Sequence, residues 1–198
     1  MFKIFKSKSV NKSEEQESIY KMILRAEEEN KIENLKLRHV ESKDEDILKL
    51  EEALLDYYSK DRLAIEEFER YFKNHRLEDI KEKFERFIFS MDTLKEDKLV
   101  GLSILLMRDT TEPEAVKFGI FLANFYPLVN VRGAIKIITD LGAHEDFTKY
   151  SLSTLKQLEI YPVVRDNILR RGNDKVKDIA EKLNETWKKK INSKKGFK

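Results

Sequence analysis

Residues 99–107 read LVGLSILLM, residues 115–126 read AVKFGIFLANFY, and residues 131–142 read VRGAIKIITDLG. These three runs are the densest apolar material in the chain, so we expect the hydrophobic core to form around them. We read all three as antiparallel helices packed side by side, because the links between them are short. The first run lacks turn dipeptides, but periodicity alone does not distinguish a helix from a buried strand there.

The middle run begins with the signature of a helix start. Thr111 and Glu114 have the spacing of a capping box, and Pro113 stands in the first turn between them. After this start only Lys117 and Asn124 are strongly polar, and a separation of seven residues puts both on one narrow face. A helix that is apolar around the rest of its circumference must be covered on most sides by other elements.

The third run has a regular apolar stripe and ends at a glycine. The stripe repeats at helical spacing and consists of Val131, Ala134, Ile135, Ile138 and Leu141. Gly142 follows the stripe and is expected to cap the C-terminal end of the helix. We expect Ile138 in this run, and Ile120 in the preceding one, to be fully buried.

Composition favours an all-helical protein. Charged residues make up 38% of the 198 residues and hydrophobic residues 40%, and the chain has only 6 Gly and 3 Pro. Few helix breakers, together with many Glu, Lys and Leu residues, favour an all-α fold. We expect three parts: a basic leader with an amphipathic helix at 1–43, a helical-repeat domain at 44–192, and a disordered basic tail at 193–198.

The same composition excludes several classes of protein. The absence of cysteine excludes disulfides, thiolate metal sites and cysteine nucleophiles. No apolar run approaches the roughly 20 residues that span a bilayer, and the apolar part of the N-terminal segment is too short for a secretory signal. We therefore expect a cytoplasmic protein. Residues 1–13 are expected to form a disordered leader, with contact to an anionic membrane as the alternative.

Charge is distributed unevenly along the chain. Residues 161–198 contain twelve Lys or Arg and five Asp or Glu, a net charge of +7, so the rest of the chain carries −5. A basic C-terminal part on an acidic body indicates an anionic partner. The alternative is a solvated charged helix followed by a frayed lysine tail.

No motif in the chain specifies catalysis. The three histidines, His39, His75 and His144, are not paired at metal-binding spacing, and nucleotide-binding glycine loops are absent. Glu145 and Asp146 follow His144 at a predicted helix start, where acidic side chains are favoured, so we expect this cluster to cap the helix. We accordingly expect no catalytic residue, no metal site and no cofactor.

Helix pairs recur at a nearly constant interval. Val131 and Val164 are separated by 33 residues, and regular pairs of this length are typical of a solenoid. The segment NVRGAIKIITDLG (130–142), with its Val-Arg pair, Ala and terminal Leu-Gly, resembles the second helix of a HEAT repeat. EPEAVKFGIFLANF (112–125) and YPVVRDNILRRG (161–172) resemble it through their Val-Lys and Val-Arg pairs.

This resemblance implies a fold and a kind of function. It implies a short HEAT-like α-solenoid of antiparallel helix pairs, which is usually a scaffold or binding surface and specifies no reaction. We therefore expect a non-catalytic protein–protein interaction module, an adaptor or an inhibitor, whose partner has an acidic surface. The alternative is a nucleic-acid-binding protein that uses the basic C-terminal third. A remote third reading is a DNA glycosylase, because HEAT-like solenoids include enzymes of that class.

The expected binding surface is a basic ridge made of Arg132, Lys136, Arg165, Arg170 and Arg171. On helix 131–141 the apolar stripe leaves Arg132, Lys136 and Asp140 facing away. Arg165 lies 33 residues after Arg132, so one repeat should stack the two side by side, with Arg170 and Arg171 extending the same end. The alternative is that these cations pair with neighbouring acidic side chains, for which Asp140, Glu145 and Asp166 are available.

Overall fold

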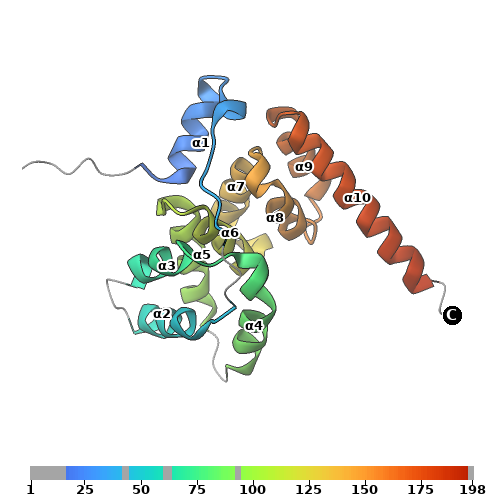
Figure 1. The fold of residues 1–198 in the computed structure, drawn as a ribbon. Coiled ribbons are helices and arrows are strands. Elements are labelled where there is room, and N and C mark those ends of the chain that lie inside the picture. The colour runs from blue at the N-terminus through green and yellow to red at the C-terminus, as the bar shows by residue number, and fades with distance from the viewer. Residues whose placement is uncertain (1–16, 42–44, 60–63, 92–94, 196–198) are drawn as a thin grey trace, which may run out of the picture.

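The computed structural model describes residues 17–41, 45–59, 64–91 and 95–195 (Figure 1). Within these ranges there is no strand, and ten α-helices take up more than half of the chain, which confirms the predicted all-α fold. Two short 3-10 turns, η1 (Ile32–Asn34) and η2 (Leu128–Asn130), lie between helices. The α-helices are α1 (Ile19–Glu28), α2 (Leu48–Tyr58), α3 (Ala64–Phe72), α4 (Leu77–Ser90), α5 (Glu96–Asp109), α6 (Pro113–Leu122), α7 (Arg132–Leu141), α8 (Glu145–Leu155), α9 (Tyr161–Arg171) and α10 (Asp174–Lys195).

The central helix is α6, which Figure 1 shows in the middle of the molecule. Every residue of α6 except Phe121 is buried, because α3, α4, α5 and α8 all pack against it. Ile120 and Ile138 are both 0% exposed, as predicted. A Cβ atom at Gly119 would lie only 2.9 Å from Cγ of Met107, so the glycine lets α5 and α6 approach closely. The three apolar runs therefore form the core as helices.

The polar residues at the start of α6 differ from the prediction. No side chain caps α6, so the predicted capping box is wrong. Glu114 instead accepts hydrogen bonds from the backbone N of Leu77 (2.9 Å) and from Nζ of Lys117 (2.6 Å), and the hydroxyl of Thr111 donates to Glu69. Lys117 is buried rather than on an exposed polar face, because the equally buried Glu114 compensates its charge.

The C-terminal helices form two layers. One layer contains α5, α7 and α9, each packed against the next, and the other contains α6, α8 and α10. The hairpins α5–α6 and α7–α8 connect the layers, while α2 packs on α3 beside α6. Three residues join α7 to α8, but nine separate α6 from α7. Because the connection from α7 to α8 is the shorter one, α7 is the first helix of a hairpin. The resemblance to a HEAT repeat implied instead that α7 would be the second helix of its pair.

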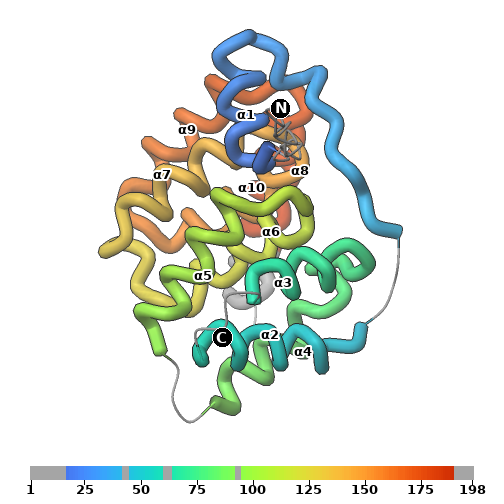
Figure 2. The backbone as a smooth tube through the Cα atoms, turned by 90° about the vertical axis from the view of Figure 1, so that its left-hand side faces the viewer, coloured from blue at the N-terminus to red at the C-terminus, as the bar shows by residue number. Residues whose placement is uncertain are grey.

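Helix α1 crosses the C-terminal ends of the α5, α7 and α9 layer (Figure 2). Its buried residues Ile19, Tyr20 and Ile23 belong to the same core cluster as the rest of the molecule. One polar contact joins α1 to the C-terminal end of each helix in this layer. These contacts are Ile19 N to Thr110 O (3.0 Å), Tyr20 Oη to Asp140 Oδ2 (2.7 Å) and the ion pair of Glu27 with Arg171. The helix predicted within 1–43 thus shares its core with the larger domain.

The ends of the chain are only partly described. The predicted leader at 1–13 and the predicted boundary at 43–44 both lie outside the described residues. Helix α10 is described to Lys195, so it includes residues 193–195 of the predicted tail, and residues 196–198 lie outside the described residues. In the described part of the chain, no helix combines the length and the hydropathy needed to cross a membrane.

Candidate functional site

A surface groove of about 380 Å³ runs between α7 and α9. The two helices run in the same direction. Their first turns therefore lie at one end of the groove and their last turns at the other. Arg132 and Val163 line the first end, and Asp140 and Arg171 line the second. The other lining residues are Ile135, Lys136, Thr139, Val164 and Asn167.

The N-terminal end of the groove is apolar and open to solvent. Val163 is 71% exposed although it is a large aliphatic residue, and Val129 and Ile160 beside the same helix ends are also exposed. Ile135 and Val164 lie deeper between the helices, and both belong to or pack on the core. Exposed aliphatic side chains that gather at one place are typical of a binding surface.

Two cations of the predicted ridge stand on the α7 side of the groove. Arg132 is exposed and forms no hydrogen bond or ion pair with any described residue. Lys136 bonds Asp140 through Nζ (2.6 Å), yet its side chain is 70% exposed, so two of its three ammonium donors can still reach a ligand. The groove therefore combines an apolar lining with available positive charge.

Arg171 lies in the same groove, but most of its donors are engaged within the protein. Its guanidinium forms a bidentate ion pair with Glu27 of α1 and also donates to Asp140 (2.9 Å) and Asn167 (3.0 Å). The hydrogen bonds to Glu27 first, and then to Asp140, raise the pKa of Arg171 above its usual value. Only 19% of its side chain is exposed. This arginine holds α1, α7 and α9 together. It therefore follows the alternative in which a cation of the predicted ridge pairs with neighbouring acidic side chains.

Asp140 is the acceptor at the centre of that contact, and the prediction that it faces away is wrong. Its side chain is only 8% exposed and accepts hydrogen bonds from Tyr20, Lys136 and Arg171. Burial alone would raise the pKa of Asp140, but the three donors outweigh burial and hold the pKa below its usual value. The apolar stripe of α7 did not reveal this because the covering residue, Tyr20, is 120 positions away.

The other two members of the predicted ridge lie elsewhere. Arg165 does not line the groove and does not stack beside Arg132; it is 3.5 Å from Asp166 on its own helix. The face of α9 toward α7 carries Val164, Asn167 and Arg171, and at 100° per residue Arg165 points away from that face. Arg170 is exposed and lines a separate hollow beside Glu27.

Sequence reasoning missed the aliphatic half of the groove. Val163 is its most exposed aliphatic member, and Val129 in the turn before α7 is also exposed; neither belongs to a buried helical stripe. An apolar residue off the stripe was the available signal: Val163 precedes the buried Val164 by one position, so it cannot face the core with it. Tyr20 and Glu27, which close the other end, gave no local signal because their partners are distant in sequence.

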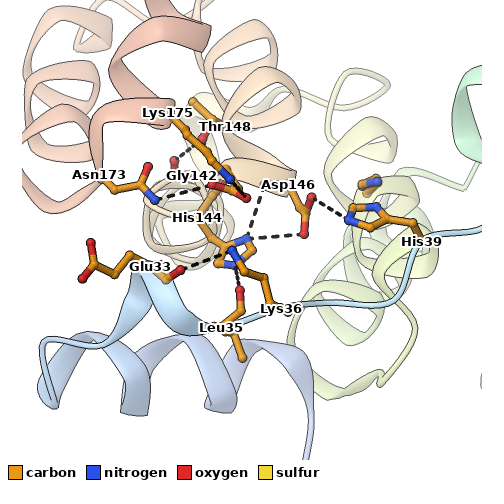
Figure 3. Close-up of polar contacts among 12 residues, drawn as sticks. Glu33, Leu35, Lys36, His39, Gly142, His144, Asp146, Thr148, Asn173 and Lys175 are labelled. Atoms are coloured by element: carbon orange, nitrogen blue, oxygen red, sulfur yellow. Dashed lines mark hydrogen bonds and ion pairs between the residues drawn. The ribbon is translucent and has the colours of Figure 1, made fainter.

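His144 and its neighbours form a structural junction (Figure 3). His144 is the N-cap of α8: its Nδ1 accepts a hydrogen bond from the backbone N of Asp146 (3.3 Å). Its other ring nitrogen, Nε2, bonds the carbonyl of Leu35 (3.0 Å), which ties the segment after α1 to the α7–α8 turn. The predicted capping role is thus confirmed. Among the residues that the structure describes, no three His, Cys, Asp or Glu are placed to hold a metal ion.

Trp187 is the one tryptophan of the chain, and it packs on the body of the protein. Its ring makes an edge contact with Tyr161, and Nζ of Lys156 lies 3.6 Å from its centroid. The ring is half-buried on α10. This arrangement explains Trp187 by packing and a cation–π contact.

Comparison with known proteins found no relative of this chain. No family model, no curated protein and no solved structure matches the chain.

Proposed function

We propose that this protein is a non-catalytic protein-interaction module whose α7–α9 groove binds an acidic, partly apolar segment of a partner protein. The observation that carries the proposal is the pairing of two features in one groove. Val163 is exposed beside the more deeply placed Ile135 and Val164, while Arg132 has no acidic partner among the described residues. Aliphatic anchors supply affinity, and an arginine that is free of intramolecular pairs supplies selectivity for an acidic residue.

We also infer that the two-layer part of the molecule is a short HEAT-like solenoid. The support is the order of contacts: each helix from α5 to α8 packs on the helix two positions later, which keeps the chain in two parallel layers. Solenoids of this kind use the grooves between successive helices of one layer as binding surfaces. A cytoplasmic location remains our expectation from the cysteine-free sequence.

Binding of nucleic acid is the alternative, and the described cations favour it less. Most Lys and Arg side chains near the start of α10 are paired with acidic residues, such as Lys175 with Glu145 and Lys177 with Asp174. Arg171 is likewise engaged by Glu27. A protein that binds a phosphate backbone needs several cations free of such partners, and among the described residues of α10 these are the exposed Lys182, Lys188 and Lys189, far from the α7–α9 groove in sequence.

The proposal can be tested by site-specific photo-crosslinking in cells that make the protein. A photoreactive amino acid at Val163 should capture a discrete partner protein, because this side chain is the exposed anchor of the groove. The matched control is the same amino acid at Leu55, which is 50% exposed and lies on α2. A captured band that survives nuclease and is lost on protease treatment identifies a protein partner.

The outcomes separate the hypotheses. Capture from Val163 and not from Leu55 supports the groove as the site. Equal capture from both positions contradicts it, and a product that nuclease destroys favours the nucleic-acid alternative instead.

A further inference from the structure

A second pocket, of about 200 Å³, lies between α4, α6 and α8. It is in the layer opposite the α7–α9 groove and shares no residue with it. Its apolar walls are Leu77 and the rings of Phe121 and Tyr150. Pockets for drug-sized ligands usually measure about 300–1,000 Å³, so this one suits a single side chain rather than a large ligand or a helix.

The aromatic wall of the pocket is continuous with an exposed phenylalanine. Phe84 in the core contacts Phe121 at 6.4 Å between ring centroids, and Phe121 contacts Phe125 at 5.1 Å. Phe125 in turn makes an edge contact with Phe89 at 5.8 Å, and Phe89 is 77% exposed. These four rings form a continuous series of aromatic contacts from the interior to the surface.

The rim of the pocket is positively charged. Lys81 and Lys149 each place Nζ 2.5–2.6 Å from a different oxygen of Glu78, and the hydroxyl of Tyr150 also donates to Glu78. Burial alone would raise the pKa of Glu78, but the hydrogen bonds from Lys149, Lys81 and Tyr150 lower it to about 2. Two ammonium groups therefore face one carboxylate, a local charge of +1, and each ammonium keeps donors for a second acceptor.

We propose that this pocket binds an aromatic side chain of a partner protein that is adjacent in sequence to an Asp or Glu. The ring would lie against Phe121 and Tyr150, which offer the edge and face contacts that aromatic pairs prefer. The neighbouring carboxylate would accept charge-assisted hydrogen bonds from Lys81 and Lys149. This surface is independent of the α7–α9 groove, so a protein with both can contact two partners at once.

Short peptides test this pocket on the full chain by NMR. The probes are N-acetyl-Asp-Phe-amide, its Asn-Phe and Asp-Ala counterparts, and free N-acetyl-phenylalanine, each titrated into protein labelled with ¹⁵N. We expect saturable shifts at Asn124 and Ser153, which line the pocket, with Asp-Phe binding about threefold more tightly than Asn-Phe because the rim is solvent-exposed. Asp-Ala should cause no shift there.

Two variants make the test specific. Ser153→Phe fills the pocket from an exposed position and should abolish the shifts, whereas Thr186→Phe, on the exposed face of α10, should leave them unchanged. Replacing Lys81 and Lys149 together by Met should remove the preference for Asp-Phe over Asn-Phe. Circular dichroism confirms that each variant is folded.

Three results would overturn the inference. They are the absence of any saturable shift with Asp-Phe, binding that Ser153→Phe does not change, and binding of N-acetyl-phenylalanine as tight as that of Asp-Phe. The last would mean that the pocket reads a free aromatic acid or a chain terminus instead of an internal acidic residue.

Discussion

The two ends of the α5, α7 and α9 layer differ in how their polar and apolar groups are used. At the C-terminal end, α1 covers the layer, and its Tyr20 and Glu27 engage Asp140 and Arg171. At the N-terminal end nothing among the described residues covers the exposed Val163, and Arg132 has no partner. The same layer thus has one end closed from within the chain and one end open.

This difference shows that charge alone does not assign a role to an arginine. Arg132 and Arg171 line one groove and carry the same charge. Four of the five donors of Arg171 are used inside the molecule, and two carboxylates, Glu27 and Asp140, already compensate its charge. Arg132 has all its donors available. We therefore assign stability to the closed end and binding to the open end.

The largest expected effect is the loss of the acceptor at the closed end. Asp140→Ala leaves Tyr20 and Arg171 without their shared carboxylate in a mostly buried place. We expect the free energy of unfolding to fall by about 3–5 kcal/mol, as when one partner of a buried pair is removed. Urea denaturation measures this. Asp109→Ala, which removes an exposed partner of Arg108, is the control and should cost less than about 1 kcal/mol.

Acid should weaken the closed end in the same way. The folded-state pKa of Asp140 lies below its usual value, so its contribution is complete above the unfolded-state pKa of about 3.9. That contribution is lost as the pH falls through the lower, folded-state pKa. The stability difference between wild type and Asp140→Ala should therefore be constant from pH 7 to 5 and shrink below pH 4. A difference that stays constant down to pH 2 would contradict this role.

A smaller effect is expected for the hydroxyl of Tyr20. Tyr20→Phe removes one hydrogen bond to Asp140 and should lower the free energy of unfolding by about 1–2 kcal/mol. Hydrogen exchange in α1 should accelerate, because α1 loses one of its three polar contacts with the layer. Tyr161→Phe is the matched control, since the buried hydroxyl of Tyr161 has no hydrogen-bond partner among the residues that the structure describes. Equal effects of both changes would mean that the contact with Asp140 is not important.

The smallest effect on stability is expected at the open end. Val163→Lys replaces an exposed aliphatic side chain and should change the free energy of unfolding by less than about 0.5 kcal/mol. A loss above about 1 kcal/mol would show that Val163 is part of the core packing and not a free anchor.

Local spacing in the sequence predicted the elements of the fold but not their polar partners. The 3.6-residue period located α6 and α7, and it placed Ile120 and Ile138 in the core correctly. The cap formed by His144 was predictable for the same reason, because its donor is two residues away. Wherever the partner is distant, local spacing failed: Thr111 bonds Glu69 and not the start of its own helix.

The candidate site shows the same limit. Arg132 and Lys136 were found from the polar face of one helix, and both line the groove. The prediction that Arg165 stacks beside Arg132 failed, because a 33-residue interval fixes the length of the repeat but not the rotation of α9 about its axis. The engagement of Arg171 required knowledge of α1, which no periodicity in the C-terminal half contains.

The most direct test of the account compares charge reversal at the two ends, with stability and crosslinking from Val163 measured on the same samples. For Arg132→Glu we predict an unchanged free energy of unfolding, within about 0.5 kcal/mol, and loss of the crosslinked partner. For Arg171→Glu we predict a loss of about 3 kcal/mol or more, because Glu27 and Asp140 are left facing a third carboxylate. If Arg132→Glu folds normally and the partner is still captured at the wild-type yield, the open end of the groove is not the binding site.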